Sequence, residues 1–109
     1  MTPAAFRKLA LGLPEATESS HMGHADFRIG KRVFATLGYP GPGSGMIKLT
    51  PLQQSQFVNA FPKVFSPVKG GWGLRGATHV TLRAATPSAL QPALFEAWRN
   101  NAPSRLLAR

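Results

Sequence analysis

Two glycine-containing turns carry the side chains of this sequence that are best suited to binding an anion. In the first turn, Lys31 and Arg32 follow Gly30 between two strand-like segments, and Arg28 stands just before it. Lysine and arginine side chains at phosphate spacing hold a nucleic acid in place without reading its bases. Cations in turns are also commonly solvated with no partner. A phosphate-binding turn and a plain basic surface therefore both stay open here.

The second turn adds an aromatic ring to the cations. Lys69 and Arg75 flank Trp72, and glycines separate the three. A ring placed among cations can stack on an exposed base. A tryptophan between glycines also serves as a packing anchor, and this alternative stays open for Trp72. The candidate DNA-binding residues are therefore Arg28, Lys31, Arg32, Lys69, Trp72 and Arg75.

Histidines and carboxylates offer little chemistry beyond this. His21, His24 and Asp26 lie close in sequence, but their spacing matches no zinc-binding pattern, and the chain has no cysteine to assist. His79 and Asp26 would suit a hydrolytic triad, yet no segment resembles the turn that presents a nucleophilic serine. We therefore expect no catalytic residue, no metal site and no cofactor, and the chain is predicted not to be an enzyme.

Charge is the strongest signal in the composition. The 109 residues hold 13 Lys and Arg against 4 Asp and Glu, which gives a net charge of +9 and a sequence pI near 11.6. Such an excess favours a polyanionic partner, and nucleic acid is the common one. Binding through phosphates would weaken steeply with added salt. Basic proteins also simply occur, for instance in organisms with GC-rich genomes, so incidental charge is the competing explanation.

Length and residue usage restrict the number of domains and the cellular compartment that we expect. A chain of this length forms one domain, residues 1–109, and can bury a hydrophobic core. The absence of cysteine excludes disulfides and fits a reducing cytoplasm. No apolar segment approaches the length of a membrane span. We expect a bacterial cytoplasmic protein that does not enter a membrane; nothing in the sequence indicates an oligomeric state.

The first turn belongs to a predicted β-hairpin, Asp26–Leu37, which is rich in β-branched and aromatic residues. A three-residue loop at 30–32 would pair Ile29 with Val33 and Phe27 with Ala35. A shift by one residue would instead move Arg32 beside Ile29, so the apolar face selects the first register. That face holds Phe27, Ile29, Val33, Ala35 and Leu37, and the other holds Asp26, Arg28, Phe34 and Thr36.

Three helices are predicted from their starting residues. Thr2-Pro3, Thr50-Pro51 and Thr86-Pro87 each combine an N-cap threonine with proline at the first helical position, although the last helix has a second possible start at Ser88. The middle helix is expected to direct Phe57, Val58 and Phe61 inward. Further strands are expected before His21 and over 46–49, 63–68 and 77–83. Pro67 favours an edge position for the segment 63–68, and alternation places His79 on the outer face of the last strand. Leu90, Leu94 and Trp98 are expected to form the buried stripe of the last helix. The pattern predicts an α+β fold, an antiparallel twisted sheet of about five strands with helices packed on one face.

Several segments of the chain resemble the MmcQ/YjbR family. The resemblance is carried by residues 13–18, by the hairpin 24–37, by Gly71-Trp72-Gly73 running into 76–82, and by Trp98 with Ala102-Pro103. It covers nearly the whole chain in the expected order. It implies a small bacterial α+β domain with a CyaY-like (frataxin-like) sandwich fold. Members of the family are described as candidate DNA-binding proteins with a double-wing arrangement.

The expected function is non-enzymatic DNA binding, in which two basic β-hairpin wings contact the phosphate backbone of duplex DNA with low sequence specificity. The resemblance places the wings at 26–37 and 63–83. The alternative is a protein-interaction or small-ligand-binding domain with incidental positive charge. The two differ in whether the cations gather on one face of the molecule or scatter over its surface.

Overall fold

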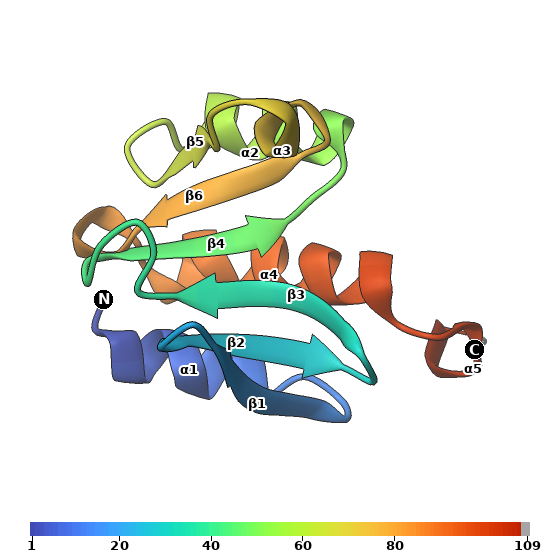
Figure 1. Cartoon of the computed structure of the whole chain (residues 1–109). Helices are drawn as coiled ribbons and strands as arrows, with labels where there is room; N and C mark the ends of the chain where they lie inside the picture. The colour runs from blue at the N-terminus through green and yellow to red at the C-terminus, as the bar shows by residue number, and fades with distance from the viewer. Residues whose placement is uncertain (108–109) are drawn as a thin grey trace.

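Six strands, rather than about five, form an antiparallel sheet in the computed structural model, which describes residues 1–107. The strands lie in the order β1-β2-β3-β4-β6-β5 (Figure 1). They are β1 (Ala16–His21), β2 (His24–Ile29), β3 (Arg32–Leu37), β4 (Ser44–Lys48), β5 (Phe65–Pro67) and β6 (Ala77–Thr81). Strand β5 is an edge strand, as predicted from Pro67, because proline is tolerated where one side of the strand is unpaired. The α+β fold class is confirmed.

Three longer helices cover one face of the sheet. Helices α1 (Pro3–Leu11) and α4 (Pro87–Asn101) lie behind the sheet in Figure 1, and α2 (Pro51–Ala60) packs against β5 and β6. The short helix α3 (Gly71–Leu74) connects β5 to β6, and a 3-10 turn (Leu82–Ala84) follows β6. The short helix α5 (Ser104–Leu107) follows α4. The opposite face, turned toward the viewer in Figure 1, is called the open face below.

Different turns lie at the two ends of the sheet. Because neighbouring strands are antiparallel, β2, β4 and β5 finish where β3 and β6 begin, at the right of Figure 1. The turn between β2 and β3 and the whole connection from β5 through α3 to β6 therefore lie at the same end. The loop between β3 and β4 and the 3-10 turn lie at the opposite end.

Each longer helix begins at a threonine followed by proline, as predicted. The hydroxyls of Thr2, Thr50 and Thr86 each accept a hydrogen bond from the amide three residues further on, at 3.1, 3.2 and 3.3 Å. The Gln53 side chain also accepts from the Thr50 amide at 3.0 Å, which completes a capping box. The proline that follows suits the first helical position, because the amide hydrogen that it lacks would have no partner within the helix. Two adjacent residues are therefore enough to determine each start.

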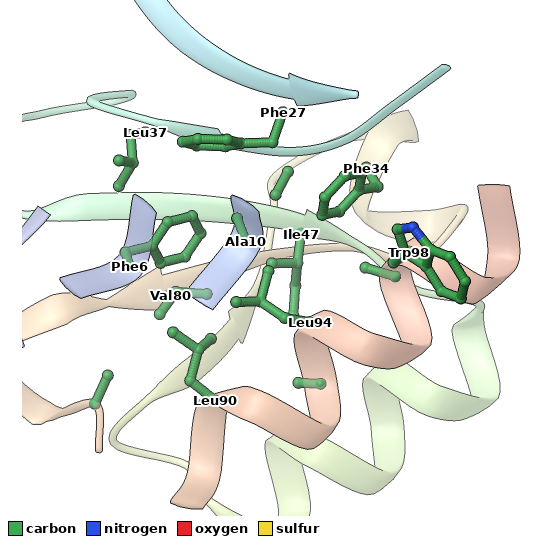
Figure 2. Packing of buried hydrophobic residues seen from close by; sticks show 14 of the residues in the cluster. Phe6, Ala10, Phe27, Phe34, Leu37, Ile47, Val80, Leu90, Leu94 and Trp98 are labelled. Carbon is green, nitrogen blue, oxygen red and sulfur yellow. The ribbon is translucent and has the colours of Figure 1, made fainter. Parts of the chain in front are cut away.

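The hydrophobic core lies between the sheet and helices α1 and α4 (Figure 2). Phe6 of α1, Phe34 of β3 and Leu94 of α4 are fully or almost fully buried in it. Trp98 closes one side of the core, and its Nε1 donates a hydrogen bond to the Pro14 carbonyl at 3.0 Å. Burial of each large apolar side chain contributes about 1.5–3 kcal/mol, so this face of the sheet supplies most of the stability.

Helix α2 buries less than predicted. Phe57 and Val58 are half-buried, but Phe61, expected to point inward, is 40 % exposed at the C-terminal end of the helix. The reason is position: α2 packs over β5 and β6 at the margin of the sheet. Among residues 1–107, its aromatic contacts are to the ring of Phe65, whose centroid lies 5.6 Å from that of Phe57 and 6.3 Å from that of Phe61.

The register predicted for the β2–β3 hairpin was wrong at its tip and right at its base. Ile29 pairs with Arg32 across a two-residue turn, whereas Phe27 pairs with Ala35 as predicted. A bulge between the two pairs absorbs the extra residue, Phe34. The predicted faces change accordingly: Phe34 is fully buried in the core, and Val33 lies on the open face. Gly30 makes the short turn possible because its φ of 63° suits the first position of such turns.

Candidate functional site

The open face of the sheet is hollowed into a groove. Residues paired in register share a face, so Asp26 of β2, Thr36 of β3 and Met46 of β4 lie in one row with His79 of β6. The groove above this row has a volume of about 740 Å³. This lies within the range of natural small-molecule sites. Its lining comes from all four of these strands and from the loops beside them.

Two exposed aromatic rings line the groove. Trp72 of α3 is 62 % exposed, and Tyr39 of the β3–β4 loop is 59 % exposed. Because α3 and that loop lie at opposite ends of the sheet, the rings are placed toward opposite ends of the groove. The Tyr39 ring packs edge-on against His24, with centroids 5.7 Å apart. The Nζ of Lys48 lies 5.9 Å from the centroid of the Trp72 ring, a distance at which a cation is attracted to an aromatic face.

The glycines around Trp72 are required by close backbone approach. A Cβ on Gly73 would lie 1.6 Å from the Val68 carbonyl oxygen, and one on Gly76 would lie 2.0 Å from the Leu49 carbonyl oxygen. The Gln54 side chain of α2 donates to the carbonyls at both ends of this segment, those of Gly73 and Ala77, at 3.1 and 2.8 Å. Helix α3 is thus clamped to the body of the protein, while its tryptophan ring stays exposed.

An ion pair between a buried carboxylate and a half-buried guanidinium lies in the lining of the groove. Asp26 is 3 % exposed, and its two carboxylate oxygens accept hydrogen bonds from Nε and Nη2 of Arg28 at 2.9 and 3.0 Å. These hydrogen bonds raise the pKa of Arg28 above its ordinary value. Arg28 was predicted to contact DNA, and in the structure its guanidinium forms two hydrogen bonds with Asp26. Since a guanidinium has five donor hydrogens, some remain for a ligand.

His79 has an unusual polar atom. Its Nδ1 is shielded from solvent and has no hydrogen-bond partner among the described residues. Within residues 1–107, every other buried side-chain nitrogen or oxygen has a partner. The residue lines the groove between Met46 and the edge strand. Leaving such an atom unsatisfied costs about 1–3 kcal/mol. Unsatisfied groups of this kind are uncommon and call for a specific explanation.

The charges of the protein are distributed unevenly. All four carboxylate side chains of the sequence are taken up in ion pairs with arginines. The pairs are Arg7–Glu18, Arg28–Asp26, Arg99–Glu96 and Arg105–Glu15. The net charge of +9 is therefore carried by cations outside these pairs.

Most of those other cations lie at one end of the sheet. Within residues 1–107, the side chains that form no ion pair and lie where β2, β4 and β5 finish are Lys31, Arg32, Lys48, Lys69 and Arg75. We call this set the basic end. All of its members are exposed except Lys48, which is half-buried beside Trp72.

Cations elsewhere are fewer and separated from the basic end. Lys63 and Arg83 lie at the opposite end of the sheet, and Lys8 lies on α1. Arg109 falls outside the described residues. The excess charge is therefore concentrated beside one mouth of the groove instead of being spread evenly.

The candidate DNA-binding residues were expected on two hairpins, and the structure places only the first group on one. Lys31 and Arg32 occupy the tip of the β2–β3 hairpin, and Lys69 and Arg75 flank α3 between β5 and β6. The segment 63–83, predicted to form the second wing, is therefore a pair of strands joined through a short helix and not a simple hairpin. The topology brings both segments to the same end of the sheet, on either side of the groove.

Sequence reasoning missed several residues that line the groove. Tyr39, Met46 and Lys48 come from segments that were assigned only structural roles. The available signal was alternation: Asp26 and His79 were correctly assigned to the faces of their strands that turn away from the core. The order of the strands, which the sequence did not give, was needed to bring those faces together.

The described part of the chain contains neither a cluster of metal ligands nor a membrane-spanning helix. No group of three or more His, Cys, Asp or Glu side chains in it is arranged to hold a metal ion. The carboxylate of Asp26, considered for such a site, is bonded to Arg28. Among residues 1–107, no helix has the length and apolar character to cross a membrane.

Comparison with known proteins gives a family and a fold. The family model described as YjbR matches residues 11–100. The crystal structure of Deinococcus radiodurans protein DR2400, described as a DUF419 domain, is similar with a TM-score of 0.71. The two chains share 19 % identity, and the similarity covers 89 % of this chain and 75 % of that one. No curated protein matches the sequence.

Proposed function

The chain belongs to the YjbR family, and on that premise we propose that it binds nucleic acid through the phosphate backbone, with the basic end as the contact surface. The observation that carries the proposal is the collection of unpaired cations at one end of the sheet. Scattered cations would have favoured the alternative of incidental charge. The family match itself supports the fold and assigns no ligand.

The pairing of every carboxylate strengthens this argument. Because each Asp and Glu is held by an arginine, no free acid within the described residues opposes an approaching polyanion at the basic end. Lys31, Arg32, Lys69 and Arg75 are exposed on turns, where long side chains can follow a phosphate chain. Contacts of this kind position a nucleic acid without specifying its sequence. We therefore propose binding of low sequence specificity.

The proposal assigns no chemical step to the protein. Asp26, the carboxylate that lines the groove, is bonded through both oxygens to Arg28 and is nearly inaccessible. A general base must reach the proton that it removes. A binding role accounts for the observed side chains without such a step.

A salt titration tests the proposal. Affinity for a fluorescently labelled oligonucleotide, measured by anisotropy, is expected to fall steeply between low and physiological salt as counterions are released. Lys31→Ala with Arg32→Ala should weaken binding and make the slope of log affinity against log salt shallower by about 2.

The matched control removes the same charge from the opposite end of the sheet. Lys63→Ala with Arg83→Ala lowers the net charge equally, and this variant should keep nearly the wild-type affinity. Equal losses in the two double variants would show that only total charge matters and would contradict a defined contact surface. Failure of the wild-type protein to bind any nucleic acid at low salt would remove the proposal altogether.

A further inference from the structure

We propose that the nucleic acid recognised by this protein is single-stranded, and that an unpaired base stacks on Trp72 at the mouth of the groove. This inference rests on the proposed function, since the same basic end would hold the backbone. It specifies which form of nucleic acid is bound, which residue contacts the base and what the groove does. Four observations on the open face carry it.

The first observation is the exposed ring of Trp72. A large aromatic side chain gains stability by burial, yet this one is 62 % exposed on a helix clamped by Gly73, Gly76 and Gln54. A packing anchor would be buried, as Trp98 is at 3 % exposed. Bases in a duplex present only their edges to the grooves. A ring held out to solvent therefore suits an unpaired base, whose face is free to stack.

The second observation is the cation beside that ring. The Nζ of Lys48 lies 5.9 Å from the Trp72 centroid and forms no ion pair among the described residues. A base and its phosphate need an aromatic surface and a positive charge at neighbouring positions. Trp72 and Lys48 supply both at the end of the groove that adjoins the basic end. Single-strand binding sites commonly combine these two features.

The third observation is the shape of the open face. The groove of about 740 Å³ runs over four strands, and Tyr39 lines it toward the far end. Neighbouring strands lie about 4.8 Å apart, so the row from β2 to β6 spans roughly 14 Å. A recess of this size can accept bases that project from a strand. It offers no complement to the continuous surface of a duplex.

The fourth observation is the chemistry of the lining. Its exposed surface is mostly apolar, with a few polar groups from Arg28, Thr36 and His79. Apolar walls with a few fixed donors and acceptors are typical of sites that bind planar heterocycles. The carboxylate of Asp26 is neutralised by Arg28, so Lys48 leaves the groove with positive charge. An anionic ligand with an aromatic part fits this combination, as a nucleotide does.

The experiment compares three ligands of equal length at one low salt concentration: a thymine decamer, the same strand with abasic sites throughout, and a ten-base-pair duplex. Wild-type protein is expected to bind the thymine strand most tightly. Trp72→Ala should weaken that binding about ten- to one-hundred-fold, the range expected for loss of one stacked base. Binding of the abasic strand and of the duplex should change less than about twofold, since their contacts are to phosphate.

Leu74→Ala is the matched control. Leu74 lies on the same short helix and is 82 % exposed, but it does not line the groove. Its removal should leave all three affinities near the wild-type values. Trp72→Phe should restore part of the thymine-strand affinity, because a smaller ring still stacks.

The outcomes separate this inference from the proposed function. If all three ligands bind with similar affinity and Trp72→Ala changes none of them, the basic end binds backbone alone and the single-strand inference is wrong. If the duplex binds more tightly than the thymine strand, the inference is also wrong, while phosphate binding stands. If none of the three binds at low salt, both proposals fail.

Discussion

The two faces of the sheet use neighbouring residues of the same strands for different purposes. On β4, Ile47 is fully buried against the helices, and Met46 beside it lies half-buried in the groove. On β2, Phe27 is part of the core, and Asp26 next to it holds Arg28 on the open face. The covered face is packed mainly with apolar side chains, and the hydroxyl of the buried Thr78 donates a hydrogen bond to the Gly76 carbonyl. The other mixes aromatic, cationic and neutral polar groups around a recess.

The difference separates the face of the sheet that determines stability from the face that is available for binding. A sheet needs one covered face to fold, and α1, α2 and α4 provide the cover. Completing the core does not require the second face, so its side chains are available for binding. The basic end and Trp72 border this second face. We therefore expect changes to the covered face to alter stability, and changes to the open face to alter binding.

The largest expected effect is on the covered face. Ile47→Ala removes a fully buried side chain and should lower the free energy of unfolding by about 2–5 kcal/mol. Met46→Ala, one residue away on the open face, should lower it by no more than about 1 kcal/mol. Urea denaturation of both variants measures the difference. Similar losses would mean that the open face is as tightly packed as the core, and the comparison would fail.

A second pair of variants tests the attachment of α3 beside the groove. Gly76→Ala places a Cβ 2.0 Å from the Leu49 carbonyl oxygen at a φ of 112°, so we expect a loss of about 3 kcal/mol or more. Gly70→Ala, at the other end of α3, has open space around it but a φ of 79° and a ψ of −156°, a region essentially restricted to glycine, so only backbone strain of about 1–3 kcal/mol applies. Thermal or urea unfolding gives both values. A Gly76 variant no less stable than the Gly70 variant would show that α3 is not clamped.

The smallest expected effect concerns an ion pair away from both the core and the groove. Hydrogen bonds from Arg105 hold the pKa of the exposed Glu15 carboxyl below its ordinary value. The pair therefore adds stability above the pKa of Glu15 in the unfolded chain. That contribution is lost as the pH falls through the lowered pKa of the folded protein.

Glu15→Gln tests this dependence. The variant should be slightly less stable than the wild-type protein near neutral pH, and the two should converge in acid. Denaturant midpoints measured from pH 7 downward provide the readout. Because the pair is exposed, the gap should also shrink in high salt. A gap that persists in acid would assign the effect of the substitution to something other than this charge.

Features set by adjacent residues could be predicted from the sequence. The three threonine–proline helix starts, the edge position of β5 and the buried stripe of Leu90, Leu94 and Trp98 are all confirmed. Each depends on local hydrogen bonding or on periodicity within one element. The α+β class followed from the order of those elements.

The errors arose where packing between distant segments decides the structure. The hairpin tip adopts a two-residue turn, and a bulge turns Phe34 into the core. Alternation alone had placed Phe34 outside. The bulge is stabilised by what covers it, and α4, which packs on β3, lies more than fifty residues further along the chain. Helix α2 likewise leaves Phe61 exposed because it covers only the margin of the sheet.

The candidate site was predicted in part for the same reason. Lys31, Arg32, Lys69, Trp72 and Arg75 were identified from their turns, and their common location at one end of the sheet depends on strand order. The groove could not be predicted, because its lining is drawn from segments that meet only in the folded sheet. Tyr39 in particular lies in a loop rich in glycine and proline, where no periodic pattern marks its orientation.

The two tryptophans allow the most direct test, because one lies on each face. Trp72 is exposed beside the groove, and Trp98 is buried with its indole N–H bonded to the Pro14 carbonyl. A thymine decamer titrated into ¹⁵N-labelled protein should shift the indole N–H signal of Trp72 and leave that of Trp98 unchanged. Shifts of Trp98 with an unmoved Trp72 would place the contact on the covered face and contradict the account.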